Sequence, residues 1–178
     1  MTTTTLNPTL SALIARLDHA TRRHRTLRRT VVGVAAALAP ALGQPDLLTD
    51  DQRAGDEAGY RQHLLHVAPD GAFSLVALVW LAGQHTPIHD HLAWCVVGVH
   101  EGVEHEIRYR RARGRLVPTG TGVNRTGSVA GLAPPGDIHL VRNPGPGPAI
   151  SLHVYGADLR ATGSSIRRTY DLPVAGAR

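Results

Sequence analysis

Lysine is absent from this 178-residue sequence, because all 19 of its Lys-or-Arg positions are Arg. With so much Ala, Gly and Pro, this choice indicates the codon bias of a GC-rich genome. The arginines give a formal net charge of +5, a balance that can mark a nucleic-acid-binding protein. Codon bias weakens that interpretation, and we expect no nucleic-acid partner.

Cysteine and long apolar runs are also scarce. The single cysteine, Cys95, excludes an intrachain disulfide and is consistent with a reducing compartment. The most apolar stretch, residues 31–42, is too short to span a membrane. The arginines before it follow a Thr-rich start and an amphipathic segment, an order that differs from a secretion signal. We therefore expect a cytoplasmic protein with no membrane partner.

The first fifty residues have helical periodicity. Leucines at helical spacing predict a helix that begins at a Thr9 or Ser11 cap and runs to about Arg25, and residues 26–38 predict a second helix. Five arginines of this region could form a DNA-contacting face: Arg22, Arg23, Arg25, Arg28 and Arg29. A solvated helix face is the preferred interpretation, since no helix-turn-helix spacing is present.

The remaining sequence predicts many short strands separated by Gly- and Pro-rich turns, which is typical of a sandwich or small barrel. Loops are expected at residues 44–57 and 120–126, and a basic turn at residues 110–115. The predicted strands are residues 60–67, 73–81, 96–99, 103–109, 128–132 and 149–155.

One stretch, residues 83–102, has the clearest chemical content: GQHTPIHDHLAWCVVGVHEG. Residues i and i+2 of a strand leave on the same face, roughly 6.5–7 Å apart. His89 and His91 can therefore face one metal ion while Asp90 faces away. The apolar strands on both sides of the pair argue against two solvated surface histidines.

The spacing of this stretch resembles the first motif of the cupin superfamily, in which a glutamate usually stands where Cys95 stands here. Residues 134–143, PPGDIHLVRN, resemble the second cupin motif. The resemblance implies a mainly β cupin barrel, a double-stranded β-helix or jelly roll, with His139 as a third metal ligand. We expect residues 1–50 to form a helical extension packed on the barrel and residues 51–178 to form the barrel domain.

A third stretch, SLHVY, alternates, so that Ser151, His153 and Tyr155 share one strand face. An inward Ser-His-Tyr row beside three histidines resembles the thiol dioxygenases of the cysteine dioxygenase family. The resemblance implies an Fe(II) cofactor held by three histidines. It also implies that both atoms of O2 are added to the sulfur of a small thiol, giving a sulfinate. The row would act beside the open side of the metal, with His153 orienting the Tyr155 hydroxyl.

The expected substrate is a small thiol carboxylate. In this family an Arg shortly after a Tyr on the first barrel strand holds the carboxylate, and the matching positions here are Tyr60 and Gln62. A Gln there resembles the bacterial 3-mercaptopropionate dioxygenase branch, in which a C-terminal Arg supplies the charge. Arg168 is favoured for that role, and the rivals are Arg167 and Arg160. The resemblance thus favours 3-mercaptopropionate over cysteine as the substrate.

Cys95 allows several interpretations. It could be a metal ligand, since positions 89, 91 and 95 share strand parity. It could be joined to Tyr155 by the thioether found in animal-type cysteine dioxygenases, or it could be a plain buried thiol, which is preferred. Two alternatives to the dioxygenase also stay open. One is a metal-binding cupin of other chemistry, such as an isomerase, and the other is a non-catalytic ligand-sensing cupin. The oligomeric state is open between monomer and homodimer.

Overall fold

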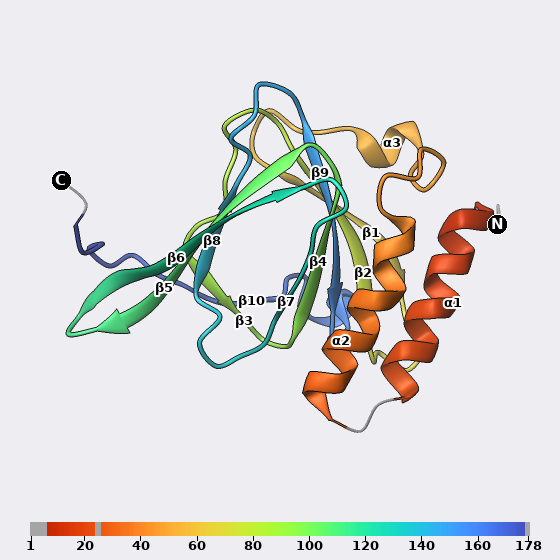
Figure 1. Cartoon of the computed structure of the whole chain (residues 1–178), viewed down its shortest axis with the longest axis horizontal. Helices are drawn as coiled ribbons and strands as arrows, with labels where there is room; N and C mark the ends of the chain where they lie inside the picture. Colours follow the sequence, from red (N-terminus) through yellow and green to blue (C-terminus); the bar gives the residue numbers. More distant parts are fainter. Residues whose placement is uncertain (1–6, 24–25, 177–178) are drawn as a thin grey trace.

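The structure is a computed structural model of the chain and describes residues 7–23 and 26–176. Two helices, α1 (Pro8–Arg23) and α2 (Leu27–Leu38), precede all the strands (Figure 1). Three short helical turns follow at intervals: η1 (Ala39–Ala41), α3 (Asp50–Arg53) and α4 (Leu159–Thr162). None of the helices in the described part of the chain is long and apolar enough to cross a membrane.

Within the described residues, ten strands form two five-stranded antiparallel sheets. One sheet has the order β1-β2-β9-β4-β7, made of β1 (Arg61–Val67), β2 (Ser74–Trp80), β9 (Ala149–Tyr155), β4 (Cys95–Glu101) and β7 (Val129–Leu132). The other has the order β10-β3-β8-β5-β6, made of β10 (Ile166–Thr169), β3 (His89–His91), β8 (His139–Arg142), β5 (Val103–Ala112) and β6 (Arg115–Arg125).

The strand order identifies the barrel type. From β2 onward the chain passes back and forth between the two sheets, apart from the β5–β6 hairpin, which stays in one sheet and extends beyond the barrel (Figure 1). Within each sheet, strands distant in the sequence are neighbours, as β2 and β9 are. This is the arrangement of a double-stranded β-helix, or jelly roll. The predicted fold class, a cupin barrel with an N-terminal helical segment, is confirmed.

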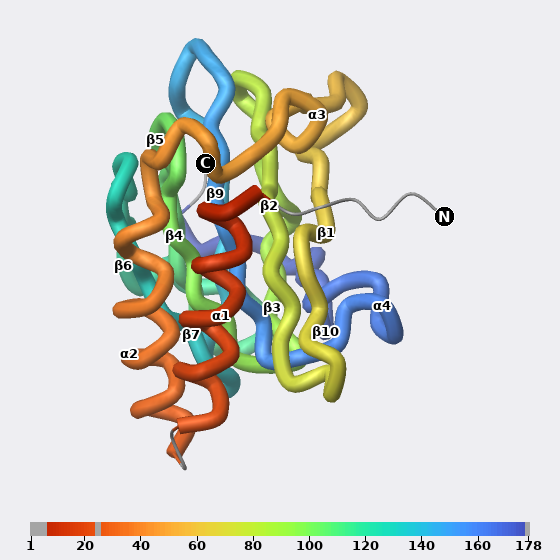
Figure 2. Tube along the Cα trace, turned by 90° about the vertical axis from the view of Figure 1, so that its right-hand side faces the viewer, coloured from red at the N-terminus to blue at the C-terminus, as the bar shows by residue number. Residues whose placement is uncertain are grey.

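The helices α1 and α2 cover the outer face of the first sheet (Figure 2). Leu13 and Leu17 of α1 and Leu38 of α2 are fully buried, in one apolar cluster with Phe73 and Leu152 of the barrel. Glycines in the sheet permit this close approach. A Cβ at Gly98 would lie 2.9 Å from Leu38, and one at Gly131 would lie 2.4 Å from Val31. The division into an extension at 1–50 and a barrel at 51–178 stays a prediction.

The helix starts differ slightly from the prediction. The side chain of Asn7 accepts a hydrogen bond of 2.7 Å from the Leu10 N–H, so Asn7 and not Thr9 or Ser11 caps α1. Thr26 is the cap residue of α2, close to the predicted boundary. The predicted end of the first helix at Arg25 lies outside the described residues.

Two predicted loops contain regular structure. The segment 44–57 includes α3. Thr49 and Gln52 cap the N-terminus of this helix as a capping box, in which the side chain of each accepts a hydrogen bond from the backbone N–H of the other. The segment 120–126 belongs mostly to β6, where Gly120 and Gly122 lie opposite Arg108 and Glu106 of β5. The large side chains of β5 occupy the space that the glycines leave, so glycine here serves strand pairing and not a turn. Only the middle of the predicted basic turn at 110–115 is a turn, between β5 and β6.

Candidate metal centre

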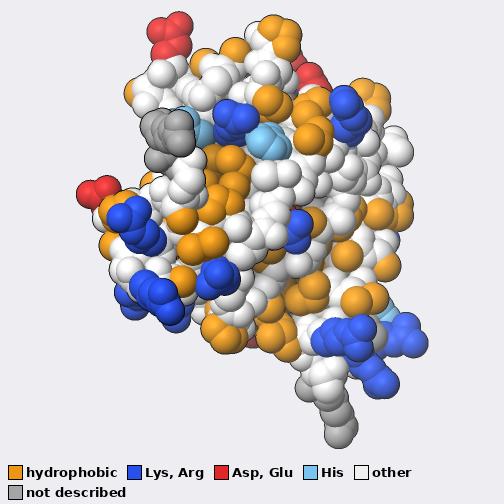
Figure 3. All heavy atoms as spheres, turned by 60° about the vertical axis from the view of Figure 1, so that its left-hand side comes forward, with side chains coloured by type: hydrophobic (Ala, Val, Ile, Leu, Met, Phe, Trp, Pro, Cys, Tyr) orange, Lys and Arg blue, Asp and Glu red, His pale blue; other side chains and the backbone are white. Residues whose placement is uncertain are grey.

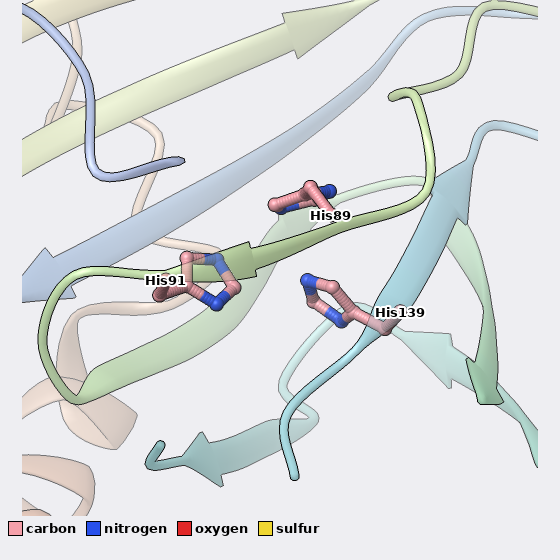
Figure 4. A group of neighbouring side chains, drawn as sticks. All are labelled: His89, His91 and His139. Carbon is pink, nitrogen blue, oxygen red and sulfur yellow. The ribbon is translucent and has the colours of Figure 1, made fainter. Parts of the chain in front are cut away.

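Three histidines meet inside the barrel. His89 and His91 come from β3, and His139 comes from the neighbouring strand β8, directly opposite His89 in the strand register. All three side chains are buried. One ring nitrogen of each lies within 4.8 Å of the others, and Figure 4 shows the imidazoles gathered around a common point. The structure therefore brings together the three residues that the motif resemblance named.

The outer nitrogen of each imidazole has a fixed partner. The Nδ1–H of His89 donates to the Pro87 carbonyl at 2.9 Å, and that of His139 donates to Glu106 Oε1 at 2.8 Å. The Nδ1–H of His91 donates to Asp137 Oδ2 at 3.0 Å. Because these partners can only accept hydrogen bonds, each Nδ1 carries the proton. The unprotonated Nε2 atoms then face one another, a donor set that suits a cation.

Burial keeps two of these imidazoles, His89 and His91, neutral. It lowers the pKa of His89 to about 3, with His139 and His91 nearby adding to the effect. The pKa of His91 is also lowered, again mainly by burial. Burial alone would raise the pKa of Glu106, but the hydrogen bond from His139 and the nearby Arg108 bring it below its ordinary value. At neutral pH His89 and His91 are therefore neutral, and an ionised carboxylate lies behind His139.

The Ser-His-Tyr row lies beside this group on β9. The Ser151 hydroxyl is 2.8 Å from His153 Nε2, and the Tyr155 hydroxyl is 2.9 Å from His153 Nδ1. The indole N–H of Trp80 donates to Ser151 Oγ at 3.2 Å. Burial lowers the pKa of His153 well below its ordinary value and raises that of Tyr155 well above it. Both side chains are therefore neutral near pH 7.

Cys95 is separate from the histidine cluster. A bend after His91 takes the chain from β3 in one sheet to β4 in the other, so the strand parity of positions 89, 91 and 95 is not continuous. In the described chain, the group of potential metal ligands contains the three histidines and does not include Cys95. Cys95 pairs across the strands with Tyr155, and its Sγ lies 3.9 Å from His153 Nδ1. Burial raises the pKa of its thiol well above the ordinary value.

A cavity opens onto the three histidines and holds about 380 Å³ of space between atoms, part of it open to solvent. His153 and Tyr155 line it, as do Tyr60 and Gln62 of the first strand region. Gln62 is exposed and Tyr60 is half-buried, so both lie toward the solvent side. The other lining residues are Leu78, Trp80, Thr86, Val141, Ser164, Ser165 and Ile166.

The three candidate arginines lie elsewhere. In the described chain no arginine lines the cavity. Arg167 is bound to the buried Asp90 carboxylate, which also accepts a hydrogen bond of 2.7 Å from Tyr170. The Arg168 guanidinium lies 5.8 Å from the centre of the Tyr170 ring, and Arg160 pairs with its neighbour Asp158 at 2.8 Å. Their role in holding a substrate therefore stays a prediction that this arrangement does not support.

The remaining arginine clusters are solvent-facing. Arg110, Arg111, Arg113 and Arg115 of the β5–β6 hairpin are exposed, and so are Arg22, Arg23, Arg28 and Arg29 of the helices. Figure 3 shows basic side chains in separate groups over one face of the molecule. Arg22 contacts the carboxylates of Asp18 and Asp70. Solvated surfaces, the preferred interpretation of these arginines, fit this exposure.

Sequence patterns did not single out four residues of the site. Asp137 and Glu106 hold the ligand histidines, Glu104 lies buried beside Ser151, and Trp80 donates to the same hydroxyl. Two of these four residues could have been found from the alternation in VEHEIRY, which places Glu104 and Glu106 on the same inward face of β5. Two carboxylates at inward positions of a half-buried strand indicate a functional interior.

No protein-family model matches the chain. Among solved structures, the chain is similar to the protein TT1209 from Thermus thermophilus (22% identity, 62% of this chain, 96% of that chain, TM-score 0.46). A Klebsiella pneumoniae protein described as having a double-stranded β-helix domain gives 20% identity over 61% of this chain and 86% of that chain, with a TM-score of 0.45. An oxalate oxidase gives 20% identity over 62% of this chain and 59% of that chain, with a TM-score of 0.49. At these values we assign the fold from the strand order of the chain itself.

Proposed function

We propose that this cupin barrel is an Fe(II)-dependent thiol dioxygenase that adds both atoms of O2 to the sulfur of a small thiol. One observation carries the proposal: His153 and Tyr155, which Ser151 extends into a hydrogen-bonded row, line the same cavity as the three histidines. In the described chain, no carboxylate or thiol joins the three histidines as a fourth ligand. One side of the site is thus left for exogenous molecules.

The donor set fits a divalent metal but does not name it, because imidazole suits iron, zinc, copper and nickel alike. The resemblance to the cysteine dioxygenase family favours iron. When bound by His89, His91 and His139, an Fe(II) ion would supply the redox chemistry and would favour the thiolate form of a bound thiol. The carboxylates of Asp137 and Glu106 would orient the rings that hold it.

In this proposal the protein's own groups position the substrate. Tyr155 keeps its proton near neutral pH, so its hydroxyl can donate a hydrogen bond at the cavity wall. His153 is neutral and orients that hydroxyl. The apolar side chains of Leu78 and Val141 complete the wall and limit the water beside the sulfur.

The substrate class is a small thiol carboxylate, with 3-mercaptopropionate first and cysteine second. Gln62 can donate two hydrogen bonds from its amide at the exposed side of the cavity, and the Tyr60 hydroxyl lies in the same region. An amide cannot pair with a carboxylate bidentately as an Arg can. Arg168 would have to leave the Tyr170 ring to take part, so we assign the carboxylate contact first to Gln62.

A metal-binding cupin of other chemistry, such as an isomerase, is the second candidate. It is favoured by the absence of an arginine from the lining of the described cavity. Such an enzyme would hold zinc or manganese with the same histidines and would not consume O2 in the presence of thiols.

Anaerobic loading with iron, followed by oxygen uptake with 3-mercaptopropionate, cysteine and cysteamine, tests the proposal. The expected result is uptake that requires iron and a sulfinate product that carries both oxygen atoms of labelled O2. His139→Ala should lose iron and uptake together, whereas His85→Ala, a change at an exposed histidine, should leave both unchanged. Uptake that is absent with every thiol, despite full iron occupancy, would favour the second candidate.

A further inference from the structure

Glu104 is a buried carboxyl group with no role in holding the metal ligands. It lies on the inward face of β5 and is 1% exposed. Its Oε1 has no hydrogen-bond partner in the structure. The polar groups of Ser151 and Trp80, which come from the opposite sheet, lie beside it. A buried carboxylate with one unpartnered oxygen is costly, which suggests that this residue does more than fill space.

Glu104 lies beside the Ser151 end of the polar row that Ser151, His153 and Tyr155 form. The chain of these polar groups runs from the closed interior, at Glu104, to the cavity wall, at Tyr155. Two of its contacts are 2.8 Å between Ser151 and His153 and 2.9 Å between His153 and Tyr155.

His153 differs from the three ligand histidines in its partners. Each ligand histidine donates to a group that can only accept, whereas His153 lies between two hydroxyls, with the Cys95 thiol also 3.9 Å from its Nδ1, and all three can donate or accept. Its own neighbours therefore do not fix which ring nitrogen carries the proton. The choice depends on the group beyond Ser151, which is Glu104.

We propose that Glu104 is a positioning residue that sets the direction of this hydrogen-bond chain and thereby decides whether the Tyr155 hydroxyl points at His153 or into the cavity. When Glu104 is ionised, Ser151 donates to it, His153 donates from Nε2 to Ser151, and Tyr155 donates to Nδ1. When Glu104 is protonated, every bond reverses. His153 then donates from Nδ1 to Tyr155, and the tyrosine proton is free for the cavity.

The two arrangements satisfy Ser151 equally well. Its oxygen accepts from the Trp80 N–H in both states. In one state it also accepts from His153 and donates to Glu104, and in the other these two roles are exchanged. The reversal therefore leaves no hydroxyl unpaired inside the protein, and a small change at Glu104 can select either state.

The protons balance along the chain. One proton enters from the cavity at Tyr155, which passes its own proton to His153 Nδ1. His153 passes the Nε2 proton to Ser151, and Ser151 passes its proton to Glu104. The net change is one proton taken up by the protein, and no group other than Glu104 changes charge.

Charged and titratable neighbours support a transition near neutrality. Burial raises the pKa of Glu104 to about 7 and Glu106 on the same strand adds to the rise, while Ser151 and Trp80 oppose it. The other facing groups are Cys95 on β4 and His153 and Tyr155 on β9. Burial disfavours the charged forms of all three, so none of them replaces Glu104 as the titrating group.

Nitrogen-15 NMR of the histidine rings in metal-free protein tests the proposal, because the shifts of Nδ1 and Nε2 report the tautomer. His153→Gln identifies the His153 signals. Between about pH 5.5 and pH 8.5, His153 should change from mainly Nδ1–H to mainly Nε2–H, with a midpoint near pH 7. Glu104→Gln should abolish this change, and Glu57→Gln, at an exposed carboxyl, should preserve it.

A His153 tautomer that stays constant over this range would overturn the proposal, and so would an unchanged transition in Glu104→Gln. Only one part of this inference rests on the proposed function: that the Tyr155 hydroxyl would act on a thiol substrate in the cavity. Since the measurement needs neither iron nor O2, a negative result leaves that activity standing, and a missing oxygenase activity leaves the tautomer result standing.

Discussion

Replacing Glu106 by Gln should weaken metal binding without removing a ligand. The Glu106 carboxylate accepts a 2.8 Å hydrogen bond from the Nδ1–H of His139, inside the barrel, and the pKa of Glu106 lies below its ordinary value. The glutamine would keep an acceptor of similar size but would lose the negative charge that makes the imidazole a stronger donor to metal. Losses of this kind are typically 10–100-fold in metal affinity, or about 1.4–2.7 kcal/mol.

Competition with a chelator of known affinity measures this effect for zinc and for iron under anaerobic conditions. Glu57→Gln, which removes the same charge at an exposed position, is the matched control and should bind as the unchanged protein does. A double-mutant cycle with His139→Ala adds a second check, because Glu106→Gln should cost little once its imidazole is gone. An affinity within about twofold of the unchanged protein would show that the carboxylate does not act through His139.

Three further outcomes are expected. The pKa of Glu104 rises from 4.5 to about 7 on folding, so this residue stabilises the native state below pH 4.5 and the stabilisation is lost as the pH rises to about 7. Chemical denaturation should therefore give a free energy of unfolding about 3 kcal/mol lower at pH 8 than at pH 5, and Glu104→Gln should remove this difference. Leu13→Ala, at a fully buried helix position, should lower the free energy of unfolding by about 2–5 kcal/mol, and separate unfolding of helix and barrel signals would argue against their shared core. Intact-mass analysis should give the unmodified mass if Cys95 is a plain thiol, and a loss of two hydrogens if it is joined to Tyr155.

The histidine cluster could be predicted because short-range geometry determines most of it. Alternation along a strand places His89 and His91 on one face whatever the partners of that strand are. The same reasoning grouped Ser151, His153 and Tyr155, which the structure places in one hydrogen-bonded row. Alternation within a single strand thus predicted correctly which side chains lie together.

Patterns that extend across a turn did not transfer. The parity argument for Cys95 assumed an unbroken strand, but the bend after His91 moves the chain into the other sheet. In β10 the pairing register with β3 shifts between Ile166 and Arg168, an irregularity that alternation along the sequence does not show. A local pattern contains no information about such bends or bulges.

The outer carboxylates change the electrostatic reasoning about the site. From the sequence, replacing the usual cupin glutamate by Cys95 leaves a divalent ion with its full charge and therefore with a strong attraction for anions. In the structure, Asp137 lies directly behind His91 and the ionised Glu106 directly behind His139, so the effective positive charge of a bound ion would be reduced through the imidazole rings. A thiolate would then be selected less by net charge than by the open side of the site and the Tyr155 hydroxyl.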